Sequence, residues 1–89
     1  MVEEQIEIIN KLGLHARAAA KLVNTAAAFG SKVTVHFGDQ QADAKSIMSV
    51  MMLAAAQGSL INIQCEGDDE QAALNALTDL ISDYFGEEE

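Results

Sequence analysis

The chain has 89 residues, 49% of them hydrophobic, and a formal net charge of −9 from 14 acidic and 5 basic residues. A chain of this length builds one modest core, so we expect a single domain over residues 1–89. The acidic balance argues against nucleic acid or an anionic membrane as a partner, and no apolar run approaches the roughly 20 residues that insert across a bilayer.

The first third of the chain predicts a strand, a loop and a helix. Residues 2–8 alternate between apolar and polar side chains, which is typical of a half-buried strand. A loop over residues 10–14 leads into a helix from about Ala16 to Phe29, and Gly30 is placed to end it. The apolar residues of this helix recur at the spacing of one buried face, namely Ala19, Leu22, Val23, Ala26 and Phe29.

The middle of the chain predicts two strands joined by a tight turn. Residues 32–37 alternate again, so their valines and phenylalanine face inward, and His36 lies on the polar face as an ordinary surface histidine. Gly38-Asp39 marks the turn, and a short polar strand returns through about residue 43.

A second helix and a fourth strand follow. Ser46 is placed to cap this helix and Gly58 to end it. The strand over residues 60–66 places Cys65, the only cysteine, on its apolar face as a small buried hydrophobe. A single cysteine allows no internal disulfide, which favours a reducing cytoplasm. The apolar stripe expected on the second helix consists of Ile47, Val50, Met51 and Ala54.

A last helix follows Gly67, with Asp68 or Asp69 as its cap. The acidic tail over residues 86–89 is expected to fray. The expected buried face of the last helix consists of Ala73, Leu74, Leu77, Leu80, Ile81 and Tyr84.

The predicted order of elements is therefore β-α-β-β-α-β-α. Because one face of each strand is apolar, we expect an antiparallel or mixed sheet with helices on a single face, which is an α/β (α+β) two-layer sandwich. Periodicity leaves the order of the strands within the sheet open.

The most informative stretch is the loop that carries His15 to the mouth of the first helix. The first backbone N–H groups of a helix lack intrahelical partners and bind anions readily. Arg17 adds a guanidinium that matches the geometry of phosphate or carboxylate. Neutral imidazole is a competent nucleophile toward phosphorus, so we interpret His15 as a phosphoryl-accepting histidine, the alternative being a cap or a solvated surface residue.

The charge distribution supports this interpretation. Between Asn10 and Phe37 there is no acidic residue, and that segment carries +4, so the remainder of the −9 chain carries −13. A positive potential focused around His15 suits a phosphate-handling site. The four cations are Lys11, Arg17, Lys21 and Lys32.

No other motif indicates chemistry. His15, His36 and Cys65 share no metal-ligand spacing, and no phosphate-binding loop, nucleophile elbow or dinucleotide fingerprint occurs. We therefore expect neither a metal nor a cofactor.

The segment Lys11-Leu12-Gly13-Leu14-His15-Ala16-Arg17, with Ser46-Ile47-Met48 downstream, resembles the HPr family, the histidine phosphocarriers of the bacterial phosphotransferase system. The resemblance runs from the first strand to the last helix. It implies an open-faced β-sandwich, in which three helices cover one face of a four-stranded antiparallel sheet. The acidic balance, with Asn24 and Ala27 where sugar-system carriers often have lysines, is also similar to the nitrogen-related paralogue NPr.

The resemblance also implies a site and its partners. His15 would take a phosphoryl group on Nδ1 from phospho-enzyme I, in a phosphoenolpyruvate-dependent reaction, and pass it to IIA proteins in sugar uptake or nitrogen-related regulation. Arg17 and the backbone N–H groups of Ala16 and Arg17 would bind the phosphoryl oxygens. The protein would be a cytoplasmic monomer and a phosphoryl carrier with a transient phosphohistidine, rather than a stand-alone catalyst.

Two further expectations concern regulation and docking. Ser46 matches a serine that a dedicated kinase phosphorylates in some bacteria, and the adjacent Ile47, Met48 and Met51 are expected to include the surface on which partners dock. Core packing is the alternative role for the methionines. Ala18 stands where the family usually has proline, so the helix entry gains an N–H donor and is less rigid.

Two other functional classes remain open from the residues. An acylphosphatase-like domain, also a small α/β sandwich with an arginine at a loop–helix junction, would hydrolyse acyl phosphates without needing His15. A purely regulatory module would act through protein contacts alone, although the pairing of His15 with Arg17 counts against it.

Overall fold

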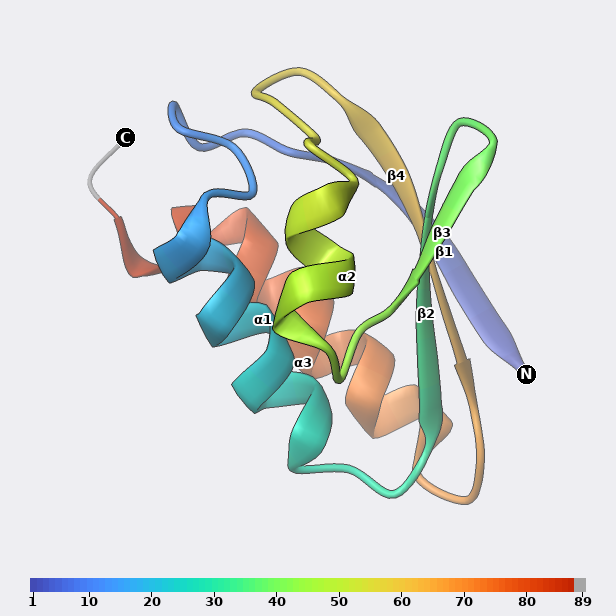
Figure 1. The fold of residues 1–89 in the computed structure, drawn as a ribbon. Helices are drawn as coiled ribbons and strands as arrows, with labels where there is room; N and C mark the ends of the chain where they lie inside the picture. Colours follow the sequence, from blue (N-terminus) through green and yellow to red (C-terminus); the bar gives the residue numbers. More distant parts are fainter. Residues whose placement is uncertain (88–89) are drawn as a thin grey trace.

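The structure is a computed structural model that describes residues 1–87, and it consists of one four-stranded sheet with three helices on one face (Figure 1). This order, β-α-β-β-α-β-α, confirms the predicted two-layer architecture. Among residues 1–87 no helix is long and apolar enough to cross a bilayer. The strands are β1 (Val2–Glu7), β2 (Lys32–Phe37), β3 (Gln40–Asp43) and β4 (Leu60–Glu66), and the helices are α1 (Ala16–Ala27), α2 (Ile47–Met52), α3 (Glu70–Ser82) and the 3-10 turn η1 (Tyr84–Gly86).

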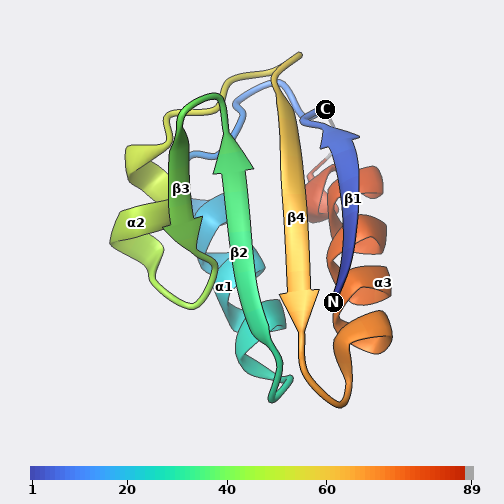
Figure 2. The ribbon, with the colours of Figure 1, turned by 90° about the vertical axis from the view of Figure 1, so that its right-hand side faces the viewer.

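All strand pairs in the sheet are antiparallel, and the spatial order is β1-β4-β2-β3 (Figure 2). The first strand therefore pairs with the last, and β4 pairs with β2 on its other side. β2 and β3 form the predicted hairpin around Gly38-Asp39. Figure 2 shows the open face of the sheet in front and the helices behind it.

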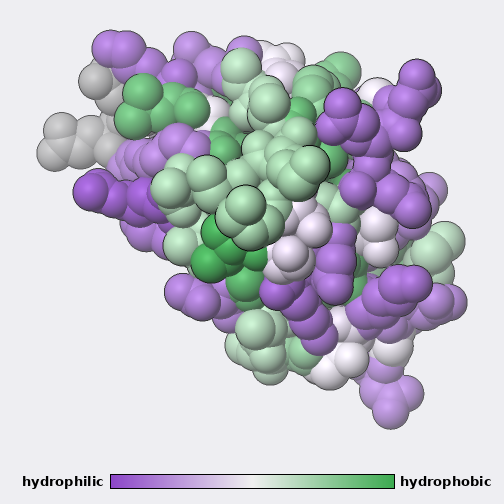
Figure 3. All heavy atoms as spheres, viewed as in Figure 1, coloured by the Kyte–Doolittle hydropathy of each residue, from purple (hydrophilic) through white to green (hydrophobic). Residues whose placement is uncertain are grey.

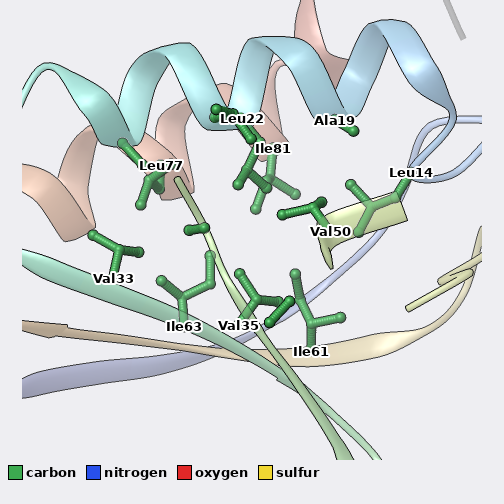
Figure 4. Packing of buried hydrophobic residues seen from close by; sticks show 14 of the residues in the cluster. Leu14, Ala19, Leu22, Val33, Val35, Val50, Ile61, Ile63, Leu77 and Ile81 are labelled. Carbon is green, nitrogen blue, oxygen red and sulfur yellow. The ribbon is translucent and has the colours of Figure 1, made fainter. Parts of the chain in front are cut away.

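The core lies between the helices and the sheet (Figure 4). Leu22 of α1 and Leu77 of α3 face Val35 and Ile63 of the sheet, and all four side chains are fully buried. Burying an aliphatic side chain of this size contributes roughly 1.5–3 kcal/mol, so this layer fixes α1 over the sheet. The loop that enters α1 is thereby held at one end of the sandwich.

The second helix is shorter than predicted. It ends at Met52 instead of near Gly58, because Ala54 takes a left-handed backbone conformation with φ at 53°. The reason lies in tertiary pairing, since the next residue, Ala55, is drawn into the core and its carbonyl oxygen accepts a hydrogen bond from Leu14 N at 2.9 Å.

The predicted apolar stripe of α2 is accordingly wrong in part. Val50 is fully buried, but Ile47, Met51 and Ala54 are exposed. Leu53 and Ala55, which follow the end of the helix, supply the buried contacts in their place.

The chain after α3 also departs from the prediction. Tyr84 and Phe85 have left-handed backbones, with φ at 58° and 55°, so the chain reverses and Phe85 is buried where Tyr84 was expected. Tyr84 is 40% exposed. The tail does not fray at Glu87, which packs back toward the start of α1; the last two residues of the predicted frayed tail lie outside the described residues.

Candidate functional site

His15 stands at the entrance of α1. It occupies the N-cap position with φ −75° and ψ 177°, and its side chain makes no capping hydrogen bond. The first intrahelical bond runs from Ala19 N to His15 O at 2.8 Å, so the N–H groups of Ala16, Arg17 and Ala18 precede the helical ladder. These donors sit at the positive end of the helix dipole. The entrance of α1 can therefore receive an anion next to a nucleophilic ring nitrogen.

Arg17 is the cation that this entrance offers to an anion. Its side chain is exposed and makes no hydrogen bond or ion pair within residues 1–87. Lys21 lies one turn further along the same helix face, but its Nζ donates to the carbonyl oxygen of Phe85 at 2.6 Å. Of these two basic side chains, only Arg17 has no hydrogen-bond or ion-pair partner within residues 1–87.

The loop before His15 is rigidly tied. Asn10 is fully buried, and its Nδ2 donates to the carbonyl oxygen of Gly13 at 2.9 Å, while Gly13 N donates to the carbonyl oxygen of Asn10 at 3.2 Å. Leu14, the residue immediately before His15, is 5% exposed and packs in the core. These contacts fix the backbone immediately before His15.

Glu87 completes the site from the far end of the chain. Its Oε2 lies 2.7 Å from Nε2 of His15, and its Oε1 accepts a hydrogen bond from Asn10 Nδ2 at 2.8 Å. The side chains of His15 and Glu87 are 27% and 13% exposed. Burial raises the pKa of Glu87, but the hydrogen bonds from His15 and Asn10, the charge of His15 when its ring is protonated and the charge of Lys21 outweigh it, so the pKa is lowered overall. Glu87 is therefore a carboxylate at neutral pH.

The structure places His15, Ala16 and Arg17 at the entrance of α1, and sequence reasoning missed Glu87 and the role of Asn10. No local signal marks Glu87, because 72 positions separate it from His15. The sequence offers one indirect clue. Phe85, followed by a glycine, is a large apolar residue in an otherwise polar tail, and such a residue tends to pack in the core.

Ser46 lies at the other end of α2 from the His15 loop. It is the N-cap of α2, and its Oγ accepts a hydrogen bond from Ser49 N at 3.3 Å. The six residues of α2 rise about 9 Å from there toward the segment that contacts Leu14 (Figure 1). Ser46 therefore lies at the start of α2, and the His15 loop lies near the other end of this helix.

An apolar surface covers α2, and we call it the α2 surface. Figure 3 shows these apolar side chains gathered in the middle of this face of the molecule. The methionines of α2 do not fill the core, because the exposed fractions of Met48, Met51 and Met52 are 69%, 38% and 75%. The α2 surface consists of Ile47, Met48, Met51 and Met52.

The remaining candidate groups lie apart from this site. His36 is on the open face of the sheet, where its Nε2 lies 2.9 Å from Oε1 of Gln64. Burial raises the pKa of the Cys65 thiol, and the charges of Glu70 and Asp69 raise it further, so the thiol is protonated and inert. Within residues 1–87 no group of three His, Cys, Asp or Glu residues could hold a metal ion.

Comparison with known proteins bears on the whole chain. A family model described as "PTS HPr component phosphorylation site" matches residues 2–83. A protein from Neisseria meningitidis named phosphocarrier protein HPr is 55% identical over 89 residues, with 100% of both chains covered. One from Shewanella violacea named phosphocarrier protein NPr is 41% identical over 86 residues, which cover 97% of this chain and 94% of that one. The crystal structure of "HPr-C-His" from Thermoanaerobacter tengcongensis has a TM-score of 0.96 at 49% identity, with 100% of both chains covered.

Proposed function

Because the chain belongs to the HPr family of phosphocarrier proteins of the phosphotransferase system, we propose that His15 is the residue that carries its phosphoryl group. His15 receives the group from phospho-enzyme I, which is charged by phosphoenolpyruvate, and delivers it to a IIA protein in the cytoplasm. Family membership favours this role over an acylphosphatase-like hydrolase and over a purely regulatory module. The relatives include proteins named HPr and NPr, so the proposal covers both sugar uptake and nitrogen-related regulation.

The observation that carries the proposal is the position of His15 at the N-cap of α1 with its ring partly exposed. A phosphoryl group on the ring would lie against the N–H groups of the first helical turn, where the helix dipole stabilises negative charge. Arg17, exposed and uncommitted within residues 1–87, adds a fork of donors for the phosphoryl oxygens. Catalysis of phosphoryl transfer depends mainly on positioning and electrostatic stabilisation, and this entrance supplies both.

We assign partner docking to the α2 surface, and in particular to Ile47, Met48 and Met51. An exposed apolar surface is typical of a protein-binding site, and the segment that follows α2 contacts the loop before His15. Methionine side chains adapt to different partners, which suits a carrier that must bind a donor and then an acceptor. A kinase acting on Ser46 would place a phosphate at the edge of this surface and so regulate docking.

The test is phosphorylation of the purified chain by phosphoenolpyruvate and enzyme I, read by intact mass. We expect one acid-labile, base-stable phosphate on the wild type and none on His15→Ala, which should keep a normal melting curve. The matched control is His36→Ala, because His36 lies on the open face of the sheet and should not affect uptake. A His15→Ala chain that still gained phosphate would refute the assignment.

A further inference from the structure

We propose that Glu87 is a positioning residue for phosphoryl transfer, whose carboxylate holds the proton on Nε2 of His15 and leaves Nδ1 as the nucleophile. The inference rests on the proposed function of His15. It goes beyond that function because it assigns a role to a residue in the C-terminal tail, outside the loop and helix that carry the family resemblance.

The direction of the hydrogen bond decides which ring nitrogen is free. A carboxylate can only accept, so the 2.7 Å contact between Glu87 Oε2 and His15 Nε2 requires the proton to be on Nε2. A neutral imidazole carries one proton, so its lone pair is then on Nδ1. Histidines that act as ligands or bases are oriented in the same way by an acceptor on their second nitrogen.

The same contact suits the charge that develops during transfer. When Nδ1 attacks, the N–P bond forms and the bond from phosphorus to the donor breaks, with its electron pair leaving on the donor. The proton on Nε2 stays in place, so the phosphorylated ring acquires positive charge. The Glu87 carboxylate lies against that edge of the ring and balances this charge without any proton being moved.

The tail is built to hold Glu87 in this place. Phe85 is fully buried although its backbone is left-handed, and its carbonyl oxygen is held by Lys21 Nζ. Gly86 has φ at 77°, and a Cβ there would stand 3.0 Å from Lys21 Nζ, so a glycine suits the turn. Asn10 holds the second carboxylate oxygen. Phe85 and Lys21 therefore fix the backbone before Glu87, and Asn10 holds the carboxylate itself.

An inhibitory role for Glu87 predicts the opposite result, because a carboxylate near the site repels a phosphoryl dianion. In that case Glu87 would inhibit uptake, and its removal would accelerate the reaction. The sign of the rate change therefore separates the two roles.

The first experiment uses NMR on the unphosphorylated protein. In wild type the Nε2–H of His15 should give a proton resonance protected from exchange, and this resonance should be lost in Glu87→Ala. The contact between His36 Nε2 and Gln64 provides an internal control in the same spectrum, because Glu87 does not take part in it. Persistence of the His15 signal in Glu87→Ala would overturn the proposal.

The second experiment measures phosphate uptake from phospho-enzyme I. We expect kcat to fall about tenfold in Glu87→Ala, with KM nearly unchanged, because a charge-assisted hydrogen bond contributes at the reacting ring and not at the docking surface. Glu87→Gln retains an acceptor but loses the charge, so it should lie between Glu87→Ala and wild type. The control is Glu66→Gln, an equal change of charge at an exposed residue at the end of β4.

The outcomes separate this inference from the proposed function. Normal phosphorylation of His15 with an unchanged or raised kcat in Glu87→Ala would overturn the role of Glu87 alone. Phosphate found at another residue of the wild-type chain would overturn both. Loss of the protected resonance together with a lower kcat and rescue by Glu87→Gln would support the proposal.

Discussion

Gly13 lies so close to Ala55 that a side chain at residue 13 would collide with the carbonyl oxygen of Ala55. A Cβ on Gly13 would stand 2.6 Å from that oxygen, which also accepts the hydrogen bond from Leu14 N at 2.9 Å. The loop that carries His15 is therefore registered directly against the segment after α2. This contact sets the position of the His15 loop relative to the end of α2.

Substitution of Gly13 by alanine should consequently damage both stability and transfer. Gly13 has φ at 66°, which costs a residue with a Cβ about 1–2 kcal/mol, and the backbone clash adds about 1–3 kcal/mol. The melting temperature and the rate of phosphate uptake should both fall. Gly38→Ala is the matched control, since Gly38 has φ at 60° but nothing within 4 Å of the added Cβ. Equal losses in the two variants would show that the contact with Ala55 is unimportant.

Arg17→Ala should slow phosphoryl uptake without abolishing it. The N–H groups of the first helical turn remain in the variant, so we expect a loss of about tenfold to a hundredfold. The melting temperature should hardly change, because the side chain is exposed. Lys32→Ala removes the same charge from the opposite end of the molecule, at the start of β2, and should leave the rate unchanged. If the two variants behaved alike, Arg17 would not belong to the site.

Ser46→Asp should fold normally yet accept phosphate more slowly. Aspartate is as good an N-cap as serine, and its charge is favourable at a helix N-terminus, so the cap that Ser46 provides to Ser49 N is kept. The added charge borders the α2 surface, and we expect uptake to fall about threefold to tenfold through weaker docking. Ser46→Asn keeps the cap without the charge and should transfer at the wild-type rate. Unchanged rates for both variants would make Ser46 only a helix cap.

Asp69 should make the fold sensitive to acid. Its side chain is at the predicted N-cap of α3 but bonds the turn after α1, accepting from Ser31 Oγ and from the backbone N–H groups of Gly30 and Ser31. The hydrogen bond from the Ser31 hydroxyl, followed by that from Gly30 N, holds the pKa of Asp69 below its ordinary value despite some desolvation. Because the pKa is lower in the folded state, the Asp69 carboxylate stabilises the fold fully above about pH 4. This stabilisation is lost as the pH falls through the pKa of Asp69 in the folded state.

Melting curves of Asp69→Asn against pH test this expectation. The variant should melt at a lower temperature than wild type at pH 7, and the difference should shrink on acidification. Asp68→Asn, at the exposed neighbouring position, should follow wild type throughout. A difference that stayed constant from pH 7 to the acid limit would mean that the ionised state of Asp69 contributes no stability.

Much of the fold and the centre of the site follow from local pattern. Alternation over β2 and β4, the Gly38 turn and the basic loop before α1 depend on residues that are neighbours in sequence. His15 and Arg17 could be found for the same reason, because a helix entrance and the residues beside it are adjacent along the chain. The pattern alone leaves the exposure of Met48 open, because a short apolar run has the same sequence signature whether it is buried or exposed.

The tertiary structure decided what the sequence could not determine, namely the pairing of β1 with β4, the end of α2 at Met52 and the position of Glu87 on His15. Each depends on a contact between segments far apart in the chain. At the tail, burying Phe85 contributes roughly 1.5–3 kcal/mol, and the bond from Lys21 adds to it, against a cost of about 1–2 kcal/mol for each of the left-handed residues Tyr84 and Phe85. The sequence by itself determined the histidine and its helix, whereas the packed core determined which carboxylate reaches it.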